Sequence, residues 1–190
     1  MSTQPLKIDL LKEVPFDQAY WVIPDRLLAG YYPGTALIQD AHPQLSALLG
    51  CGIRHFINLM QTDETHWYGK PIKPYETQTR SIARNLGVAV TFDRMSIKDM
   101  GVPSRIDMAR ILDRMDQKIE NGKPVYVHCL GGVGRTGTVV GCYLARHGYA
   151  SGQKVIQLIQ QLRRNTATHE RSSPESSPQI DLVLSWVAGE

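Results

Sequence analysis

Short apolar runs and helical patterns follow one another along the chain. A continuous apolar run bounded by turn residues is typical of a buried strand. Such runs predict strands over residues 53–60, 88–95 and 123–129, and two shorter strands on either side of the Pro24-Asp25 turn.

Apolar residues at three- and four-residue spacing predict helices between and after these strands. The pattern is clearest over residues 103–122, where Pro103 is expected to open the helix and Gly122 to end it. Its predicted buried face carries Ile106, Ala109, Leu112, Met115 and Ile119.

Further helices are predicted over residues 43–50, 73–87, 134–148 and 151–165, and a last one follows the Ser/Pro-rich stretch ERSSPESSPQ. The apolar residues of the last two helices are Val155, Leu158, Ile159 and Leu162 in one, and Leu182, Leu184 and Trp186 in the other.

Strands that alternate with helices predict an α/β domain, in which helices cover a central, mostly parallel or mixed sheet. The chain has 190 residues, which fits one domain with its own core, and no repeat or linker divides it. Residues 1–15 are expected to form a peripheral segment. Ligands usually bind such a fold beyond the carboxyl ends of the strands, so ligand-binding residues are expected in the segments that follow the strands.

Residues 125–138, VYVHCLGGVGRTGT, place a glycine-rich turn directly between a predicted strand and a predicted helix. Glycines allow such a turn to aim successive N–H groups at one point. The helix start adds the positive end of its dipole, and Arg135 adds a planar fork that matches two phosphate oxygens. These features predict a cup for phosphate or another tetrahedral oxyanion. Its residues are Leu130, Gly131, Gly132, Val133, Gly134 and Arg135.

Cys129 lies at the bottom of the predicted cup. Positive surroundings at a helix start favour a thiolate, so we interpret Cys129 as a nucleophile. His128 is expected to orient the loop and hold the thiolate, and Thr136 to donate its hydroxyl to the departing sulfur. Two nucleotide-binding loops fit less well, because no Lys-Ser/Thr pair follows the glycines and a dinucleotide fingerprint gives Cys129 no role. An inert packing cysteine is the remaining alternative.

A thiolate that attacks phosphorus expels an oxygen leaving group, which needs a proton from a positioned acid. Asp63, Asp93 and Asp99 are the candidates. Asp99 is favoured because it lies in the loop IKDMGVPS, where Gly101 is the expected hinge. The same carboxylate is then expected to act as the base for water. Asp93, at a strand end, is interpreted as a turn or salt-bridge residue.

The stretch HCLGGVGRTG resembles the His-Cys-(five residues)-Arg-Ser/Thr signature of the cysteine-dependent protein tyrosine phosphatase superfamily. DMGVP resembles its acid loop, although Ile97 and Lys98 stand where the larger tyrosine-specific enzymes have tryptophan and proline. Together with WVIPDRLLAGYYPG, this resemblance points to the compact dual-specificity branch and covers most of residues 20–186. It implies a phosphatase-like fold, a cysteinyl-phosphate intermediate, and a late-loop glutamine, Gln179 here, that positions the water. A surface glutamine at a helix start is the equal alternative.

The resemblance also bears on the substrate. Family members that act on inositol polyphosphates or phosphoinositides often carry extra basic residues in the loop, whereas residues 130–134 contain no lysine. Phosphotyrosine in a phosphoprotein or phosphopeptide is therefore the expected substrate, and phosphoserine and phosphothreonine stay open. The alternatives are an inositol polyphosphate or phosphoinositide phosphatase, a non-catalytic phosphate-binding module, and an arsenate or sulfur enzyme with the same cup.

Composition and charge narrow the partners. The net charge of +3 is dispersed, without a Lys/Arg block, so no nucleic acid is expected. No apolar run approaches the ~20 residues of a membrane helix, and no secretory signal is recognised. The three cysteines are an odd, low number, which favours a reducing compartment, the cytoplasm. Cys51 and Cys142 are interpreted as structural, and a redox role for Cys142 is the minor alternative. The histidines lack metal-ligand spacing, so neither a metal nor a cofactor is expected.

Overall fold

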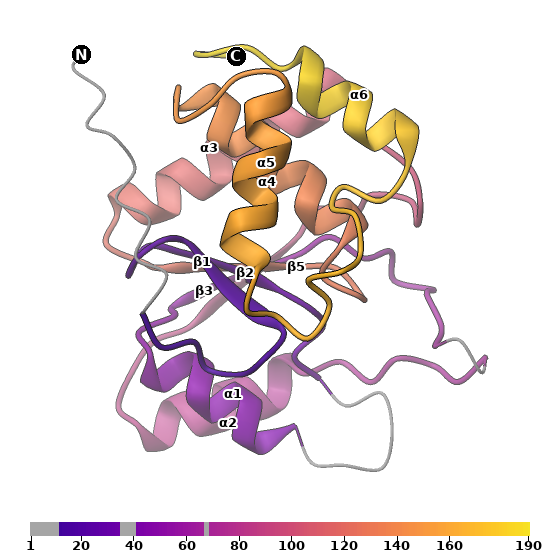
Figure 1. The fold of residues 1–190 in the computed structure, drawn as a ribbon. Coiled ribbons are helices and arrows are strands. Elements are labelled where there is room, and N and C mark those ends of the chain that lie inside the picture. The colour runs from indigo at the N-terminus through magenta and orange to yellow at the C-terminus, as the bar shows by residue number, and fades with distance from the viewer. Residues whose placement is uncertain (1–11, 35–40, 67–68) are drawn as a thin grey trace.

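A five-stranded mixed sheet lies at the centre of the computed structural model, which describes residues 12–34, 41–66 and 69–190. Its strands are β1 (Ala19–Ile23), β2 (Leu27–Gly30), β3 (His55–Asn58), β4 (Thr91–Arg94) and β5 (Val125–His128). Their order across the sheet is β1-β2-β5-β3-β4 (Figure 1). Only the edge pair β1 and β2 is antiparallel, which confirms the predicted mostly parallel or mixed sheet.

Helices cover both faces of this sheet (Figure 1). On one face lie α1 (His42–Gly50) and α2 (Glu76–Asn85). On the other face lie α3 (Arg105–Glu120), α4 (Gly134–Arg146), α5 (Gln153–Arg163) and α6 (Ser177–Ser185). No helix in the described ranges combines the length and the apolar character that crossing a lipid bilayer would require.

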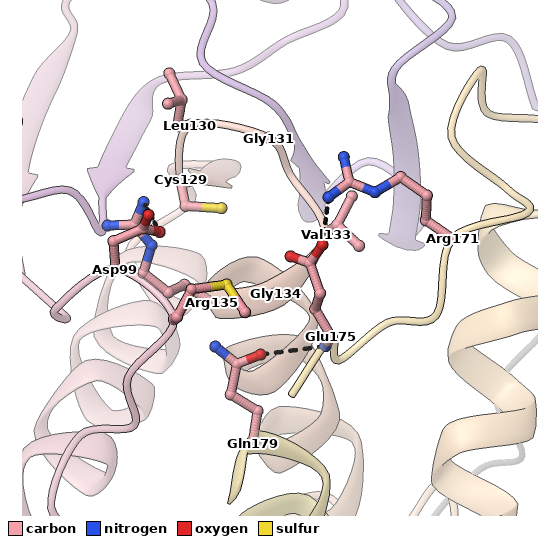
Figure 2. Close-up of a pocket in the computed structure, with 11 residues that line it drawn as sticks. Asp99, Cys129, Leu130, Gly131, Val133, Gly134, Arg135, Arg171, Glu175 and Gln179 are labelled. Atoms are coloured by element: carbon pink, nitrogen blue, oxygen red, sulfur yellow. Dashed lines mark hydrogen bonds and ion pairs between the residues drawn. The ribbon is translucent and has the colours of Figure 1, made fainter. Parts of the chain in front are cut away.

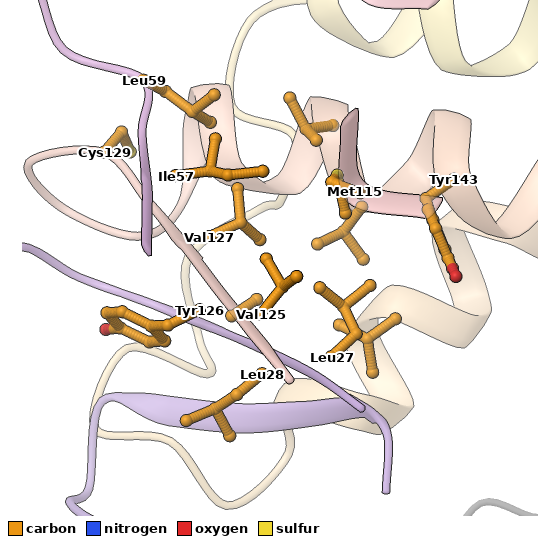
Figure 3. Close-up of a cluster of buried hydrophobic side chains, with 14 of the residues drawn as sticks. Leu27, Leu28, Ile57, Leu59, Met115, Val125, Tyr126, Val127, Cys129 and Tyr143 are labelled. Atoms are coloured by element: carbon orange, nitrogen blue, oxygen red, sulfur yellow. The ribbon is translucent and has the colours of Figure 1, made fainter. Parts of the chain in front are cut away.

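The core fills the space between the sheet and the helices. Val125, Tyr126 and Val127 of β5 are fully buried, so this central strand is apolar on both faces, as expected for a parallel strand between two helical layers. Figure 3 shows Leu27, Ile57 and further core side chains gathered around β5. Cys129 belongs to the same buried cluster, directly after the strand.

The strands and helices occur where the sequence predicts them, but their boundaries and buried faces differ. The strand predicted over residues 53–60 is only four residues long. Pro103 does not open α3, because Ser104 is its N-cap and accepts a hydrogen bond from the Asp107 amide at 3.1 Å. Ile106 is 68% exposed, so its assignment to the buried face is wrong. The fully or nearly fully buried residues of α3 are Met108, Ile111, Leu112 and Met115.

The predicted buried residues agree with the structure in α5 but only in part in α6. The predicted face of α5 is confirmed, since Val155, Leu158, Ile159 and Leu162 are all buried. In α6, Leu182 and Leu184 are only partly buried. The buried residues within that helix are Gln179 and Val183, one turn apart, and the predicted Trp186, at its C-cap, is buried as well.

Only part of the predicted peripheral N-terminal segment can be placed, since residues 1–11 lie outside the described ranges. Its remaining residues lie against β1, where the indole N–H of Trp21 donates to the Glu13 carbonyl at 2.9 Å. Lys12 pairs with Asp25 at 2.7 Å.

The parallel strands end in register, and this fixes where the functional residues gather. Gly30 is level with His128, His128 with Asn58, and Asn58 with Arg94. The segments that follow β2, β3, β4 and β5 therefore leave the sheet at one edge. This is the edge at which the glycine-rich turn was expected to bind its ligand.

Candidate active site

A pocket of about 240 Å³ opens at this edge of the sheet (Figure 2). It is formed by the loop after β5, the loop after β4 and the segment between α5 and α6. The lining residues are Asp99, Met100, Cys129, Leu130, Gly131, Val133, Gly134, Arg135, Arg171, Glu175 and Gln179. Of the predicted site residues, His128, Gly132 and Thr136 do not line it, and we find them in supporting positions.

The glycine-rich loop owes its shape to close contacts with its surroundings. Gly132 has φ +70°, and a Cβ there would lie 2.6 Å from the carbonyl carbon of Gly30. The Leu130 carbonyl accepts from the amide of Tyr32 at 3.0 Å, and α4 starts at Gly134. The loop is thus docked on the end of β2, with the N-terminus of α4 facing the pocket, as the sequence predicts.

The His128 side chain holds the glycine-rich loop by a contact with the main-chain carbonyl of Cys129. It is fully buried, and its Nδ1 lies 3.1 Å from the carbonyl oxygen of Cys129, while its Nε2 lies 2.6 Å from the hydroxyl of Tyr75. Burial lowers the pKa of His128 to about 3, so the ring is neutral near pH 7. A neutral ring whose Nδ1–H donates to the Cys129 carbonyl fixes the loop, but it adds no positive charge for a thiolate.

Arg135 is held from several sides in a buried position, where its side chain is 2% exposed. Glu64 binds both terminal nitrogens of the guanidinium, with Nη2 to Oε2 at 2.9 Å. Nη1 also donates to the carbonyl of Ile97 at 3.1 Å, and Nη2 lies 2.9 Å from Oδ1 of Asp99. Burial is the largest single influence and lowers the pKa of Arg135, but the hydrogen bonds of Glu64 together with the coulombic attraction of Cys129, Glu64 and Asp99 outweigh it, so the pKa is raised.

Sequence reasoning missed Glu64, which lies 71 positions before Arg135. A signal was available, because Glu64 follows the carboxyl end of a predicted strand, at the same edge as the glycine-rich loop. Parallel strands bring such segments together even when they are far apart in the sequence.

Asp99 is the only one of the three candidate acids that lines the described pocket. Its carboxylate is 67% exposed and is turned toward Arg135. The left-handed residue of its loop is Met100 (φ 57°), whereas Gly101, the expected hinge, forms a turn in which its amide donates to the Lys98 carbonyl at 2.9 Å. Asp93 lies elsewhere, in an ion pair with Arg114 at 2.6 Å and with its Oδ2 3.0 Å from Nε2 of His55, in agreement with its interpretation as a salt-bridge residue.

Gln179 is fully buried and lines the pocket, so the alternative of a surface glutamine is wrong. Its Oε1 accepts from the amides of Glu175 and Ser176, at 3.1 and 3.2 Å. Its Nε2 donates to the carbonyl of Gly101 at 3.1 Å. The side chain therefore ties the start of α6 to the loop that carries Asp99.

Further predicted residues lie below or away from the pocket. The Thr136 hydroxyl is buried and has no hydrogen-bond partner in the described parts of the chain. Cys142 is fully buried in the core, where burial raises the pKa of its thiol. Cys51 donates to the Leu48 carbonyl, and burial raises its pKa as well. Within residues 12–34, 41–66 and 69–190, no group of three or more His, Cys, Asp or Glu side chains is arranged to hold a metal ion.

Two charged residues at the pocket mouth were not predicted. Arg171 and Glu175 lie on the segment between α5 and α6 and form an ion pair, which Figure 2 shows beside the glycine-rich loop. The stretch that carries them contacts the glycine-rich loop, because the hydroxyl of Ser173 donates to the carbonyl of Val133, 40 positions earlier. Its Ser/Pro-rich sequence gave no sign of this contact.

Comparison with known proteins agrees with this geometry. Residues 17–179 match the family model described as PTP-SAK, the Swiss Army Knife protein DSP-PTPase phosphatase domain. Protein tyrosine phosphatase domain-containing protein 1 of Danio rerio is 27% identical over 144 residues, which is 76% of this chain and 20% of that protein. The mouse protein of the same name is 28% identical over 146 residues, 77% of this chain and 19% of that protein. The chain thus spans about a fifth of the length of these curated relatives.

Solved structures share the fold. The structure of PTPMT1 in complex with PI(5)P superposes with a TM-score of 0.64 at 19% identity, and covers 90% of this chain and 94% of that one. Kinase associated phosphatase, solved with its catalytic-site cysteine replaced by serine, gives a TM-score of 0.64 at 16% identity over the same shares of the two chains.

Proposed function

Because the chain belongs to the PTP-SAK family of DSP-PTPase phosphatase domains, we propose that it removes phosphate from phosphotyrosine in proteins through a cysteinyl-phosphate intermediate. The observation that carries this proposal is the meeting of Cys129, Arg135 and Asp99 in one pocket at the N-terminus of α4. Cys129 and Arg135 come from the segment after β5 and the first turn of α4, Asp99 comes from the loop after β4, and the proposed chemistry needs all three. A reducing compartment such as the cytoplasm would keep Cys129 free to react.

In the first step, the Cys129 thiolate attacks phosphorus, and the bond from phosphorus to the ester oxygen breaks. The main-chain amides of residues 130–134 and the guanidinium of Arg135 hold the phosphate oxygens. Asp99 donates its proton to the departing oxygen. Since Nη2 of Arg135 contacts Asp99 in the structure, the incoming phosphate displaces this carboxylate toward the leaving group. There Asp99 takes up a proton from solvent or from the substrate monoanion before it acts as the acid.

In the second step, water attacks phosphorus, the sulfur–phosphorus bond breaks, and Asp99 takes the proton of the water. The buried Thr136 hydroxyl, which lacks another partner in the described residues, supports a role as donor to the departing sulfur. Gln179 keeps one Nε2 hydrogen beyond the one it donates to Gly101, and we propose that this hydrogen orients the water.

The lining of the pocket supports an aryl phosphate. Met100, Leu130 and Val133 supply apolar surface for a ring, and none of the described residues that line the pocket is a lysine. Phosphoserine, phosphothreonine and inositol phosphates are the alternative substrates.

The test is hydrolysis by the purified chain of a phosphotyrosine peptide, matched phosphoserine and phosphothreonine peptides, and inositol phosphates. We expect phosphotyrosine to be the best substrate, with competitive inhibition by vanadate. Cys129→Ser should abolish turnover, and Asp99→Asn should lower kcat by about 10²–10⁴ because the leaving oxygen loses its proton donor.

Cys142→Ser is the matched control, since this cysteine is buried outside the pocket, and it should retain activity. Equal rates for Cys129→Ser and the wild type would remove the mechanism. An unreactive chain that still binds phosphate would instead indicate a non-catalytic binding module.

A further inference from the structure

The ion pair of Arg171 and Glu175 lies along the phosphate cup, with Arg171 near Gly131 and Glu175 near Gly134. A Cβ on Gly131 would lie 3.9 Å from Nη1 of Arg171, and a Cβ on Gly134 would lie 3.2 Å from Oε2 of Glu175. Figure 2 shows the two side chains reaching toward each other beside the loop, next to Val133. A group attached to a phosphate in the cup can therefore contact this pair, which lines the same pocket.

The charges around the pocket are balanced in pairs. Among the lining residues of the described chain, the cations are Arg135 and Arg171. Arg135 is bound by Glu64 and Asp99, and Arg171 is bound by Glu175. A phosphate in the cup displaces Asp99 from Arg135, but it leaves the pair at the mouth intact. A second anionic group on the substrate then meets a guanidinium that is already paired, together with a carboxylate that repels it.

The segment that carries the pair is anchored by other contacts. Arg163, 1% exposed, donates to the carbonyls of Arg171 and Thr168, both at 2.9 Å. The Ser173 hydroxyl is fixed to the Val133 carbonyl at 2.7 Å, and the amide of Glu175 is bound by Gln179. The side chains of Arg171 and Glu175 are 48% and 31% exposed, so their mutual attraction adds little stability. Substitution of the pair should therefore leave the segment in place.

We propose that Glu175 restricts the pocket to phosphomonoesters that carry no second anionic group beside the scissile phosphate, because it occupies Arg171. This inference rests on the proposed phosphatase function and adds a residue that determines specificity. It makes singly phosphorylated aryl esters the substrate class and disfavours bisphosphates such as those of inositol.

The experiment compares kcat/KM for phenyl phosphate and benzene-1,3-bisphosphate, which differ only in the second phosphate. The wild type should prefer phenyl phosphate. In Glu175→Gln, Arg171 is released to bind the second phosphate, and the ratio of bisphosphate to monophosphate should rise about tenfold. In the double variant Arg171→Gln/Glu175→Gln this gain should disappear. Thermal unfolding of each variant checks that the fold is retained.

The inference would be overturned by a wild type that prefers the bisphosphate, by a ratio that stays the same in Glu175→Gln, or by a gain that persists in the double variant. A uniform loss of rate on both esters would place Glu175 in the chemistry and would overturn it as well.

A binding measurement separates this inference from the proposed function. The affinities for both esters are measured by calorimetry in the Cys129→Ser variant, with and without Glu175→Gln, because binding needs no turnover. If the wild type hydrolyses neither ester, the proposed function fails. The ratio of the affinities for bisphosphate and monophosphate, with and without Glu175→Gln, still decides whether Glu175 disfavours a second anionic group.

Discussion

Arg135 shows how one side chain can be oriented before any substrate arrives. Its Nη1 and Nη2 donate to Glu64, Ile97 and Asp99, while its Nε has no partner in the described residues. A phosphate that uses Nε and Nη2 therefore has to displace only Asp99. The buried pair with Glu64 keeps the guanidinium plane fixed during that exchange.

Glu64→Gln should lower kcat/KM by about 10–100-fold, mainly through KM, because a neutral amide binds the guanidinium less firmly and lets its plane turn. The expected loss is measured with an aryl phosphate, beside thermal unfolding. Asp113→Asn is the control, since Asp113 pairs with Arg146 outside the pocket, and its kcat/KM should stay unchanged. An unchanged KM for Glu64→Gln would show that Arg135 is positioned by other contacts.

Single residues were predictable from the sequence where their chemistry is local. Cys129 and Arg135 lie within one short stretch, and the structure brings them to one pocket with Asp99. Glu64 and Arg171 were missed because their roles depend on contacts between distant segments. For Gln179, sequence alone left buried and surface positions open, since burial depends on how α6 packs.

At the scale of elements, the position of the glycine-rich loop depends on β2 as much as on β5. Gly132 packs against Gly30 with a left-handed backbone, so only glycine fits there. Such a contact between segments about a hundred positions apart cannot be derived from local patterns. Local patterns do predict α5 well, whereas α3 carries two apolar stripes, and the packing of the sheet decides that Ile106 stays exposed.

Gly132→Ala should reduce activity on an aryl phosphate by at least about 10²-fold, since the new methyl group pushes the loop off β2 and misaligns its amides. Gly122→Ala is the matched control: it has φ +68°, but no atom lies within 4 Å of its would-be Cβ. Both variants should lose about 1 kcal/mol of stability from the left-handed backbone. Gly132→Ala should lose more, because its Cβ would also lie 2.6 Å from the backbone of Gly30. Only Gly132→Ala should lose activity, and equal activities would contradict the role of the β2 contact.

At the scale of the whole molecule, the parallel register gathers the loops after β3, β4 and β5 at one edge, above a fully buried core. The alternation of strands and helices predicts this class of fold. The strand order is set by packing across the sheet, so it does not follow from the sequence. Burial also extends to polar groups, since His55 and His128 are fully buried at opposite ends of strands β3 and β5.

These two histidines make the stability of the fold sensitive to acid. Burial lowers the pKa of His128 to about 3 and that of His55 to about 4, below the ordinary value of 6.5. The unfolded chain therefore binds more protons than the folded chain below about pH 6.5, and stability falls as the pH falls toward these lowered values. For each histidine the expected slope is about 1.4 kcal/mol per pH unit. Urea unfolding between about pH 7.5 and 5 should show the smaller slope in His128→Asn, whereas the same substitution at exposed His42 is the control. Parallel curves for the wild type and His128→Asn would mean that His128 already takes up its proton in the folded chain.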